Sequence, residues 1–120
     1  SETQWLKVSH DLIDEKFFDC DEKKDLVWLR LEAAILHIAC EDLEAAHVLL
    51  EKARRFYKKS CILSARSKII VEVRGSEFME MPFYREGKLL FSGDAGWLKD
   101  LINSKLEKIW KDMEKFRKSI

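Results

Sequence analysis

The sequence is poor in glycine, proline and side-chain amides, and it contains no long apolar run. Its four glycines form no Gly-x-Gly-x-x-Gly motif, which excludes the usual Rossmann nucleotide site. No stretch of about 18 apolar residues is present, and no charged-then-apolar leader starts the chain, so we expect neither membrane insertion nor secretion. Gln4 and Asn103 are the only amide side chains among 120 residues, of which 37% are charged. This composition is typical of heat-adapted proteins, and we expect a thermophilic source.

The three cysteines, Cys20, Cys40 and Cys61, form no Cys-x-x-Cys pair, and no histidine stands at metal-ligand spacing. Neither a zinc site nor a disulfide framework is indicated, so we expect no metal and a reducing, cytoplasmic location. The formal net charge is +0 at pH 7, and global charge therefore predicts no polyanion partner. Because 47% of the residues are apolar, we interpret residues 1–120 as a single domain with its own core.

Charge is nevertheless segregated along the chain. Residues 52–68 contain seven basic residues and no acidic one, whereas the first 25 residues are net acidic. The basic residues are Lys52, Arg54, Arg55, Lys58, Lys59, Arg66 and Lys68. Phe56 and Tyr57 interrupt this run, a mixture suited to phosphate contact beside an aromatic ring that stacks on a base. An equally good interpretation is a solvated helix C-terminus, where basic residues favour the helix dipole.

The hydrophobic period predicts two helices. Asp42 offers an N-cap for a helix over 42–59, with an apolar face of Leu43, Ala46, Leu50, Ala53 and Tyr57. A long helix is predicted over 94–118 from the stripe Leu98, Leu101, Ile102, Leu106, Ile109, Met113 and Phe116. Its length of about 35 Å exceeds what one small sheet can cover, so part of the stripe is expected to pack on another element or another chain.

Short β-rich runs account for most of the remaining chain. Residues 33–40, which include His37 as their only ionisable group, indicate a buried strand, and the alternating run 5–9 indicates another. Residues 11–25 are expected to be an acidic connector. The runs 61–65, 69–73, 78–83 and 88–91 are separated by turn signals and predict meandering antiparallel strands. The predicted class is α+β, with an antiparallel-rich sheet, one mid-chain helix and a long C-terminal helix.

The chemical signals are unspecific when each is taken alone. Gly93-x-x-Gly96 before a helix could present backbone N–H groups to a phosphate, but we favour an ordinary turn with an N-cap. His37 and His47 are each more often structural than catalytic in such positions. His10 follows the first strand-like run, and sites tend to form at strand ends.

Together, the motifs resemble the tRNA wybutosine-synthesizing protein 3 family nearly from end to end. The matching stretches are Trp5-Leu6-x-Val8-Ser9-His10, Ile35-Leu36-His37-Ile38-Ala39-Cys40, Ala46, Lys58-Lys59-Ser60 before Ile62, Val71-x-Val73-Arg74, Glu80-Met81-Pro82 and Gly87-Lys88-Leu89. Two features differ from the family pattern. Its N-terminal Ser-Ser-Cys-Ser-Gly-Arg-like motif is absent, and its Ser-Gly pair is Ser60-Cys61 here, which loses the turn flexibility of glycine. The resemblance therefore implies the C-terminal part of an enzyme, either a fragment or one of two pieces.

The resemblance implies an S-adenosylmethionine-dependent methyltransferase that acts on the N-4 nitrogen of a 4-demethylwyosine-type base, 3′ of the anticodon in phenylalanine tRNA. Methyl transfer to nitrogen needs a proton acceptor, for which His37 or His10 is the candidate. The candidates for holding cofactor or substrate groups are Ser60, Arg66, Arg74, Trp5, Phe83 and Tyr84. The candidate RNA phosphate contacts are Lys58, Lys59, Lys68 and Arg55.

Two other functions stay open. The chain could be a non-catalytic RNA-binding module that uses its basic segment, or an assembly domain that dimerises through the long C-terminal helix. The expected partners are tRNA and either a second copy of the chain or a separate N-terminal piece.

Overall fold

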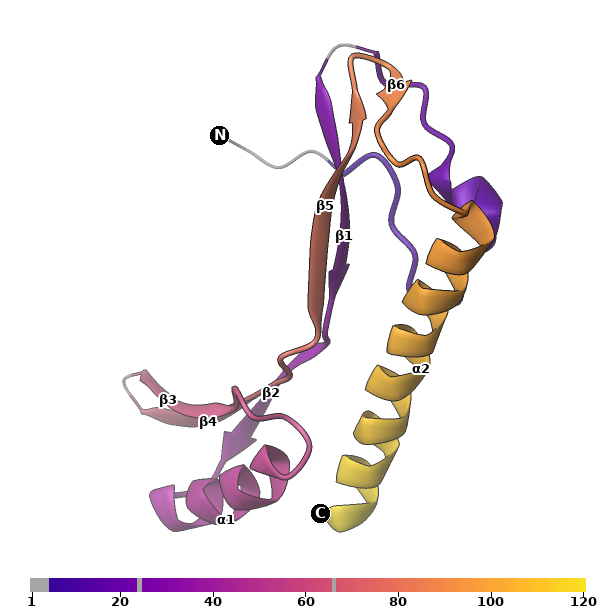
Figure 1. Cartoon of the computed structure of the whole chain (residues 1–120). Helices are drawn as coiled ribbons and strands as arrows, with labels where there is room; N and C mark the ends of the chain where they lie inside the picture. The colour runs from indigo at the N-terminus through magenta and orange to yellow at the C-terminus, as the bar shows by residue number, and fades with distance from the viewer. Residues whose placement is uncertain (1–4, 24, 66) are drawn as a thin grey trace. The chain divides into compact units, whose positions relative to one another are not determined.

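The computed structural model describes residues 5–23, 25–65 and 67–120 (Figure 1). The elements are η1 (Glu15–Phe18), β1 (Leu26–Glu32), β2 (Ile35–Cys40), α1 (Leu43–Arg54), β3 (Cys61–Ala65), β4 (Lys68–Arg74), β5 (Phe78–Arg85), β6 (Lys88–Leu89) and α2 (Ala95–Ser119). They confirm the predicted α+β class, with antiparallel strands, one mid-chain α-helix and a long C-terminal helix. No helix of the described part of the chain is long and apolar enough to cross a membrane.

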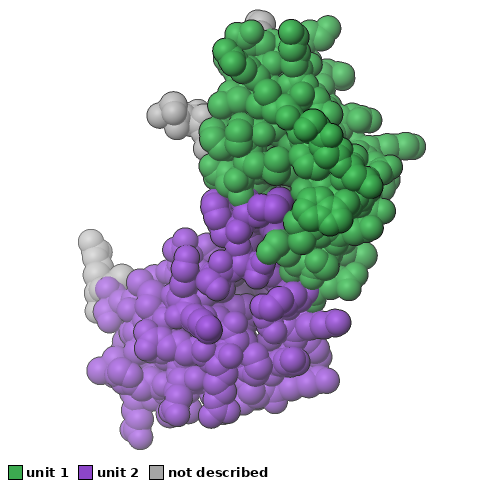
Figure 2. All heavy atoms as spheres, in the orientation of Figure 1, with its two compact units in different colours: residues 1–30, 80–107 green, residues 31–79, 108–120 purple. Residues whose placement is uncertain are grey.

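The chain divides into two compact units. Unit 1 comprises residues 1–30 and 80–107, and unit 2 comprises residues 31–79 and 108–120, coloured green and purple in Figure 2. The strands form two three-stranded sheets, in the orders β1-β5-β6 and β2-β4-β3. The interpretation of residues 1–120 as one domain stays a prediction.

The predicted single meander over residues 61–91 is wrong, because the strands form two separate hairpins. β3 pairs with β4 and β5 pairs with β6, whereas the consecutive strands β4 and β5 belong to different sheets. The Glu86-Gly87 turn between β5 and β6 is confirmed: both residues have positive φ, 51° and 80°, as a two-residue type I′ hairpin turn requires. β1 was not predicted, although its alternating exposed and partly buried residues carry the strand period.

The predicted strand over residues 5–9 is also wrong. These residues have no strand partner, and Lys7 Nζ instead contacts the carbonyls of Lys16 (3.3 Å), Phe17 (3.5 Å) and Asp19. Within the predicted connector, residues 15–18 form the 3₁₀-helix η1, and the Asp14 carboxylate caps it by accepting from the Lys16 N–H. A period of two predicts a strand only where a neighbouring strand is available to pair.

The core of unit 2 forms between α1, its sheet and the end of α2. Asp42 caps α1 as predicted, since its Oδ1 accepts from Ala45 N at 2.8 Å. The buried cluster consists of Ala46, Leu50, Ala53, Tyr57, Val71, Val73 and Phe116. Leu43, predicted on the apolar face, is exposed, and α1 ends at Arg54 rather than at residue 59. The residues after Arg54 form a turn that leads to β3.

The core of unit 1 is aromatic. Phe83 of β5 lies 5.3 Å from Phe18 and 6.1 Å from Phe91 between ring centroids, and Leu98 and Ile102 of α2 are buried in the same unit. Asp94 caps α2, because its Oδ1 accepts from Gly96 N at 2.8 Å. The preferred interpretation of Gly93-x-x-Gly96, a turn with an N-cap, is therefore confirmed.

Candidate functional site

The sheet of unit 2 has a covered face and an outward face. Val71 and Val73 of β4 are buried on the face that packs on α1. Because strand side chains alternate, Glu72 and Arg74 point the other way. The register places His37 of β2 and Cys61 of β3 directly opposite Glu72, so all three share the outward face.

The predicted burial of the strand over residues 33–40 is wrong. β2 is an edge strand with α1 on one side only, so Ile38 and Cys40 pack toward the core while Ile35 and Ala39 are exposed. The His37 side chain is 56% exposed. This histidine is therefore accessible to a ligand rather than being a core residue.

Glu72 links the two basic side chains of this face. Its Oε2 lies 3.7 Å from His37 Nε2, and its Oε1 lies 3.9 Å from Arg74 Nη1. The Glu72 side chain is 16% exposed, against 53% for Arg74, so the carboxylate is the most shielded member of the group. The carboxylate thus lies within ion-pair distance of both the imidazole and the guanidinium. We call His37, Glu72 and Arg74 the open-face triad.

Ser60 lies beneath this triad. It is 2% exposed, its Oγ accepts from Arg74 N at 3.0 Å, and its carbonyl accepts from Arg54 Nε at 3.1 Å. The predicted direct contact of Ser60 with a cofactor or substrate group would need this hydroxyl, which is buried and hydrogen-bonded. Arg66, another residue predicted to hold a cofactor or substrate group, lies outside the described residues.

The predicted RNA contacts are exposed but do not form one cluster. Lys58 and Lys59 lie next to Arg74, because Lys59 N donates to the Arg74 carbonyl at 3.1 Å. Lys68 starts β4 and is six residues from Arg74 along the strand, about 20 Å away. Arg55 follows the end of α1 and is exposed.

The remaining predicted site residues lie in unit 1. Tyr84 Oη donates to the Phe18 carbonyl at 2.9 Å, and burial raises the pKa of this phenol. Phe83 is 4% exposed and belongs to the aromatic core, so it offers no open platform for a base. Trp5 and His10 are exposed.

Sequence reasoning missed Glu72, although its signal was present. Residues 71–74 alternate apolar and polar side chains, and this period of two places Glu72 and Arg74 on one face of the strand. What sequence could not reveal was that His37 lies opposite Glu72, because that pairing joins residues 35 positions apart.

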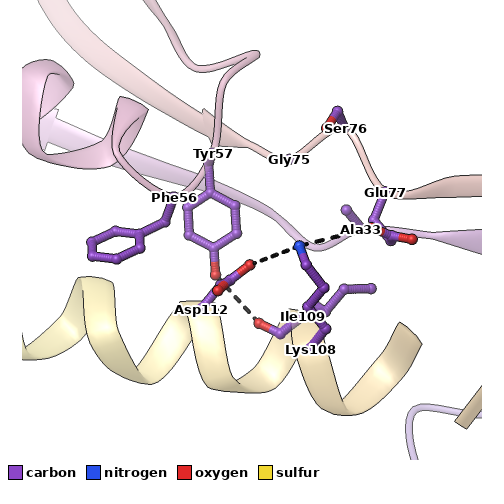
Figure 3. Close-up of a pocket in the computed structure, with 9 residues that line it drawn as sticks. All are labelled: Ala33, Phe56, Tyr57, Gly75, Ser76, Glu77, Lys108, Ile109 and Asp112. Atoms are coloured by element: carbon purple, nitrogen blue, oxygen red, sulfur yellow. Dashed lines mark hydrogen bonds and ion pairs between the residues drawn. The ribbon is translucent and has the colours of Figure 1, made fainter. Parts of the chain in front are cut away.

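A second polar group surrounds Tyr57 (Figure 3). Lys108 Nζ lies 3.3 Å from Asp112 Oδ2 and 4.0 Å from Glu77 Oε2, and Tyr57 Oη donates to the Ile109 carbonyl at 3.5 Å. Burial, followed by the negative charge of Asp112, raises the pKa of Tyr57 to about 12. The cavity between these residues measures about 30 Å³, room for roughly one water molecule. This group therefore joins α2 to the β4–β5 connection and is too small for a nucleotide.

Comparisons with known proteins give a consistent result. A family model described as methyltransferase TYW3 matches residues 1–120. A human protein named tRNA wybutosine-synthesizing protein 3 homolog is 27% identical over 117 residues, which cover 93% of this chain and 45% of that protein. A Methanocaldococcus jannaschii protein named tRNA(Phe) 7-((3-amino-3-carboxypropyl)-4-demethylwyosine(37)-N(4))-methyltransferase is 32% identical over 112 residues, covering 88% of this chain and 58% of that protein. The chain thus spans about half the length of these curated relatives.

Among solved structures, a protein from Pyrococcus horikoshii has a similar fold. The TM-score is 0.85, with 22% sequence identity, and the match covers 96% of this chain and 62% of that one.

Proposed function

Because this chain belongs to the methyltransferase TYW3 family, we propose that it takes part in the methylation of the N-4 nitrogen of a 4-demethylwyosine-type base, 3′ of the anticodon in phenylalanine tRNA. The family match over residues 1–120 is the observation that carries the proposal. S-adenosylmethionine, when bound, supplies the methyl group. The cavity beside Tyr57 is far too small for it, so no residue of that cavity is assigned to the donor.

The open-face triad suits the proton transfer that this reaction needs. As the nitrogen–methyl bond forms and the sulfur–methyl bond breaks, the sulfur keeps the bonding electron pair and the nitrogen must lose a proton. We assign the role of proton acceptor to the imidazole of His37, which is exposed enough for a nucleobase of the tRNA to reach it. The Glu72 carboxylate, 3.7 Å from His37 Nε2, is the neighbouring group that can pair with the imidazolium that results.

The cationic side chains beside the triad suit the substrate. Arg74, Lys58 and Lys59 are exposed on adjoining backbone, and Arg74 can hold a phosphate or carboxylate through two parallel hydrogen bonds. Phosphate contacts near His37 would place a nucleotide of the tRNA within reach of the imidazole, and positioning of this kind accelerates a transfer strongly.

His37→Ala tests the proposal, with His47→Ala of α1 as the matched control. Both histidines are exposed, but only His37 contacts Glu72. When the protein is incubated with methyl-labelled S-adenosylmethionine and tRNA, His37→Ala should lower the rate of methyl transfer by about 10²–10⁴-fold. His47→Ala should leave the rate within about twofold of the unaltered protein, because a surface change away from the site removes no transition-state contact.

Thermal melts of both variants separate catalysis from stability. If His37→Ala melts far lower while the folded fraction keeps its turnover, His37 is structural and His10 becomes the next candidate for the proton acceptor. If the unaltered protein binds tRNA but transfers no methyl group, the alternative of a non-catalytic RNA-binding module replaces the proposal.

A further inference from the structure

Arg74 lies just beyond the last paired residues of β3 and β4. The paired residues of these strands run from Ala65 and Lys68 to Cys61 and Glu72, so no residue of β3 lies opposite Arg74. Both backbone groups of Arg74 are nevertheless bonded on this side. Its N–H donates to Ser60 Oγ at 3.0 Å, and its carbonyl accepts from Lys59 N at 3.1 Å. The Ser60 hydroxyl therefore does what a strand carbonyl would do if β3 continued.

Ser60 can fill this place because it is itself fixed. Its N–H donates to the Tyr57 carbonyl at 3.1 Å, its own carbonyl accepts from Arg54 Nε at 3.1 Å, and its side chain is buried. Tyr57 is buried as well, with its ring edge-on to Phe116 at 6.0 Å. The turn from Tyr57 to Ser60 is thus anchored at both ends, and Lys58 and Lys59 are exposed between the anchors.

These contacts bring three cationic residues onto adjoining backbone: the Ser60 hydroxyl holds Arg74 N–H, and Lys59 N–H donates to the Arg74 carbonyl. Lys58 and Lys59 project from the anchored turn, and Arg74 projects from the strand end that the turn holds. A side chain whose backbone is already held in place loses less conformational entropy when it binds a ligand, and preorganisation of this kind raises affinity.

From this arrangement we infer that Ser60 is a positioning residue for RNA binding: it acts through Arg74 and Lys59 and does not itself touch the cofactor or the base. The inference rests on the proposed function, because it takes the tRNA phosphates to be the partner of these cations. It assigns to Ser60 a role distinct from the proton transfer at His37.

The salt dependence of tRNA binding tests this role. The logarithm of the binding constant falls with the logarithm of the salt concentration by about 0.7–0.9 for each phosphate contact. Losing one contact therefore makes the fall in affinity between roughly 50 and 200 mM salt about threefold smaller. With unmodified phenylalanine tRNA as the probe, Ser60→Ala should reduce the slope by about one contact or more. Ser64→Ala, which changes an exposed serine of β3, serves as the control and should leave the slope unchanged.

A combined variant separates positioning from a general loss of structure. In a chain that already carries Lys59→Ala and Arg74→Ala, Ser60→Ala should change the slope no further, because the side chains that it positions are gone. All measurements are made at a temperature where circular dichroism gives each variant the same spectrum. If Ser60→Ala does not fold, Ser60→Cys replaces it, since the thiol has similar size and is a weaker acceptor.

The outcomes are distinguishable. A folded Ser60→Ala variant with an unchanged slope overturns the inference while leaving the proposed methyl transfer intact. A further loss in the combined background overturns it too, because Ser60 then acts by another route. If the unaltered chain shows no salt-dependent tRNA affinity, the RNA contact of the proposed function fails, and the inference falls with it.

Discussion

At the scale of single residues, Tyr57 connects the core of unit 2 to its polar edge. Its ring packs against Phe116, and a Cβ added to Gly75 would lie 3.2 Å from Tyr57 Cδ1, a tight contact that the ring could relieve only by shifting slightly. Its hydroxyl reaches the Ile109 carbonyl beside Asp112. An ionised phenol would be both buried and next to a carboxylate, which explains why its pKa is raised.

The raised pKa of Tyr57 predicts a loss of stability in alkaline solution. The pKa is 10.0 for an ordinary tyrosine and about 12 in the folded chain, so the folded state holds the proton more tightly. The contribution of this group is complete below pH 10 and is lost as the pH rises through 12, by at most about 3 kcal/mol, since each pKa unit is worth about 1.4 kcal/mol. Urea unfolding of the unaltered chain and of Tyr57→Phe across this range should show the two stabilities converging. Parallel pH profiles would show that Tyr57 ionises as freely in the folded as in the unfolded state.

At the scale of the element, α1 depends on its first turn. The helix has 12 residues, a length at which an isolated helix is marginal in water, so it needs its cap and its packed face. Ala46, Leu50 and Ala53 supply the packed face, and Asp42 supplies the cap. α1 in turn carries the Tyr57–Ser60 turn at its C-terminal end, so an effect on the helix also reaches the cationic side chains.

Removal of this cap should destabilise the chain measurably. In Asp42→Ala the N–H of Ala45 loses the carboxylate acceptor at 2.8 Å, and a lost N-cap typically costs about 0.5–2 kcal/mol. Glu41→Ala is the matched control, since it removes an exposed carboxylate next to the cap without removing the cap. Urea unfolding should separate the two variants. Equal stabilities would mean that general charge, and not the Asp42 hydrogen bond, matters at this helix start.

At the scale of the whole molecule, positive and negative charges are equal in number but unevenly distributed along the chain. The chain carries 22 basic and 22 acidic residues, so attraction to RNA cannot come from its net charge. The exposed pair Lys58 and Lys59 beside Arg74 forms a local concentration of positive charge. Lys68, about 20 Å along β4, is a separate contact.

This distribution predicts that the position of the basic residues affects tRNA binding more than their number does. Lys58→Ala with Lys59→Ala should weaken tRNA binding and lower its salt slope by about two contacts. Lys111→Ala of α2, paired with Lys115→Ala, removes the same charge from exposed positions and should change both quantities little. Filter binding at several salt concentrations measures affinity and slope together. An equal loss in both double variants would mean that overall charge governs binding.

Local pattern was sufficient for much of this molecule. The period of 3.6 predicted α1 and α2, Asp42 was a recognisable N-cap, and Glu86-Gly87 was a recognisable hairpin turn. Strands β3, β4 and β5 were predicted within two residues at each end. These features depend on residues a few positions apart, whose backbone preferences and side-chain spacing are written in the sequence itself.

Tertiary structure alone decided which face of each strand is covered and which distant residues meet. His37 was predicted in a buried strand but is exposed, because α1 covers only the other face of β2. Glu72 became part of the site only through its pairing opposite His37, and the Ser60 hydroxyl became buried only because the Tyr57–Ser60 turn meets the end of β4. Strand pairing and packing join residues far apart in the chain, and a local period carries no information about which distant partner each residue will contact.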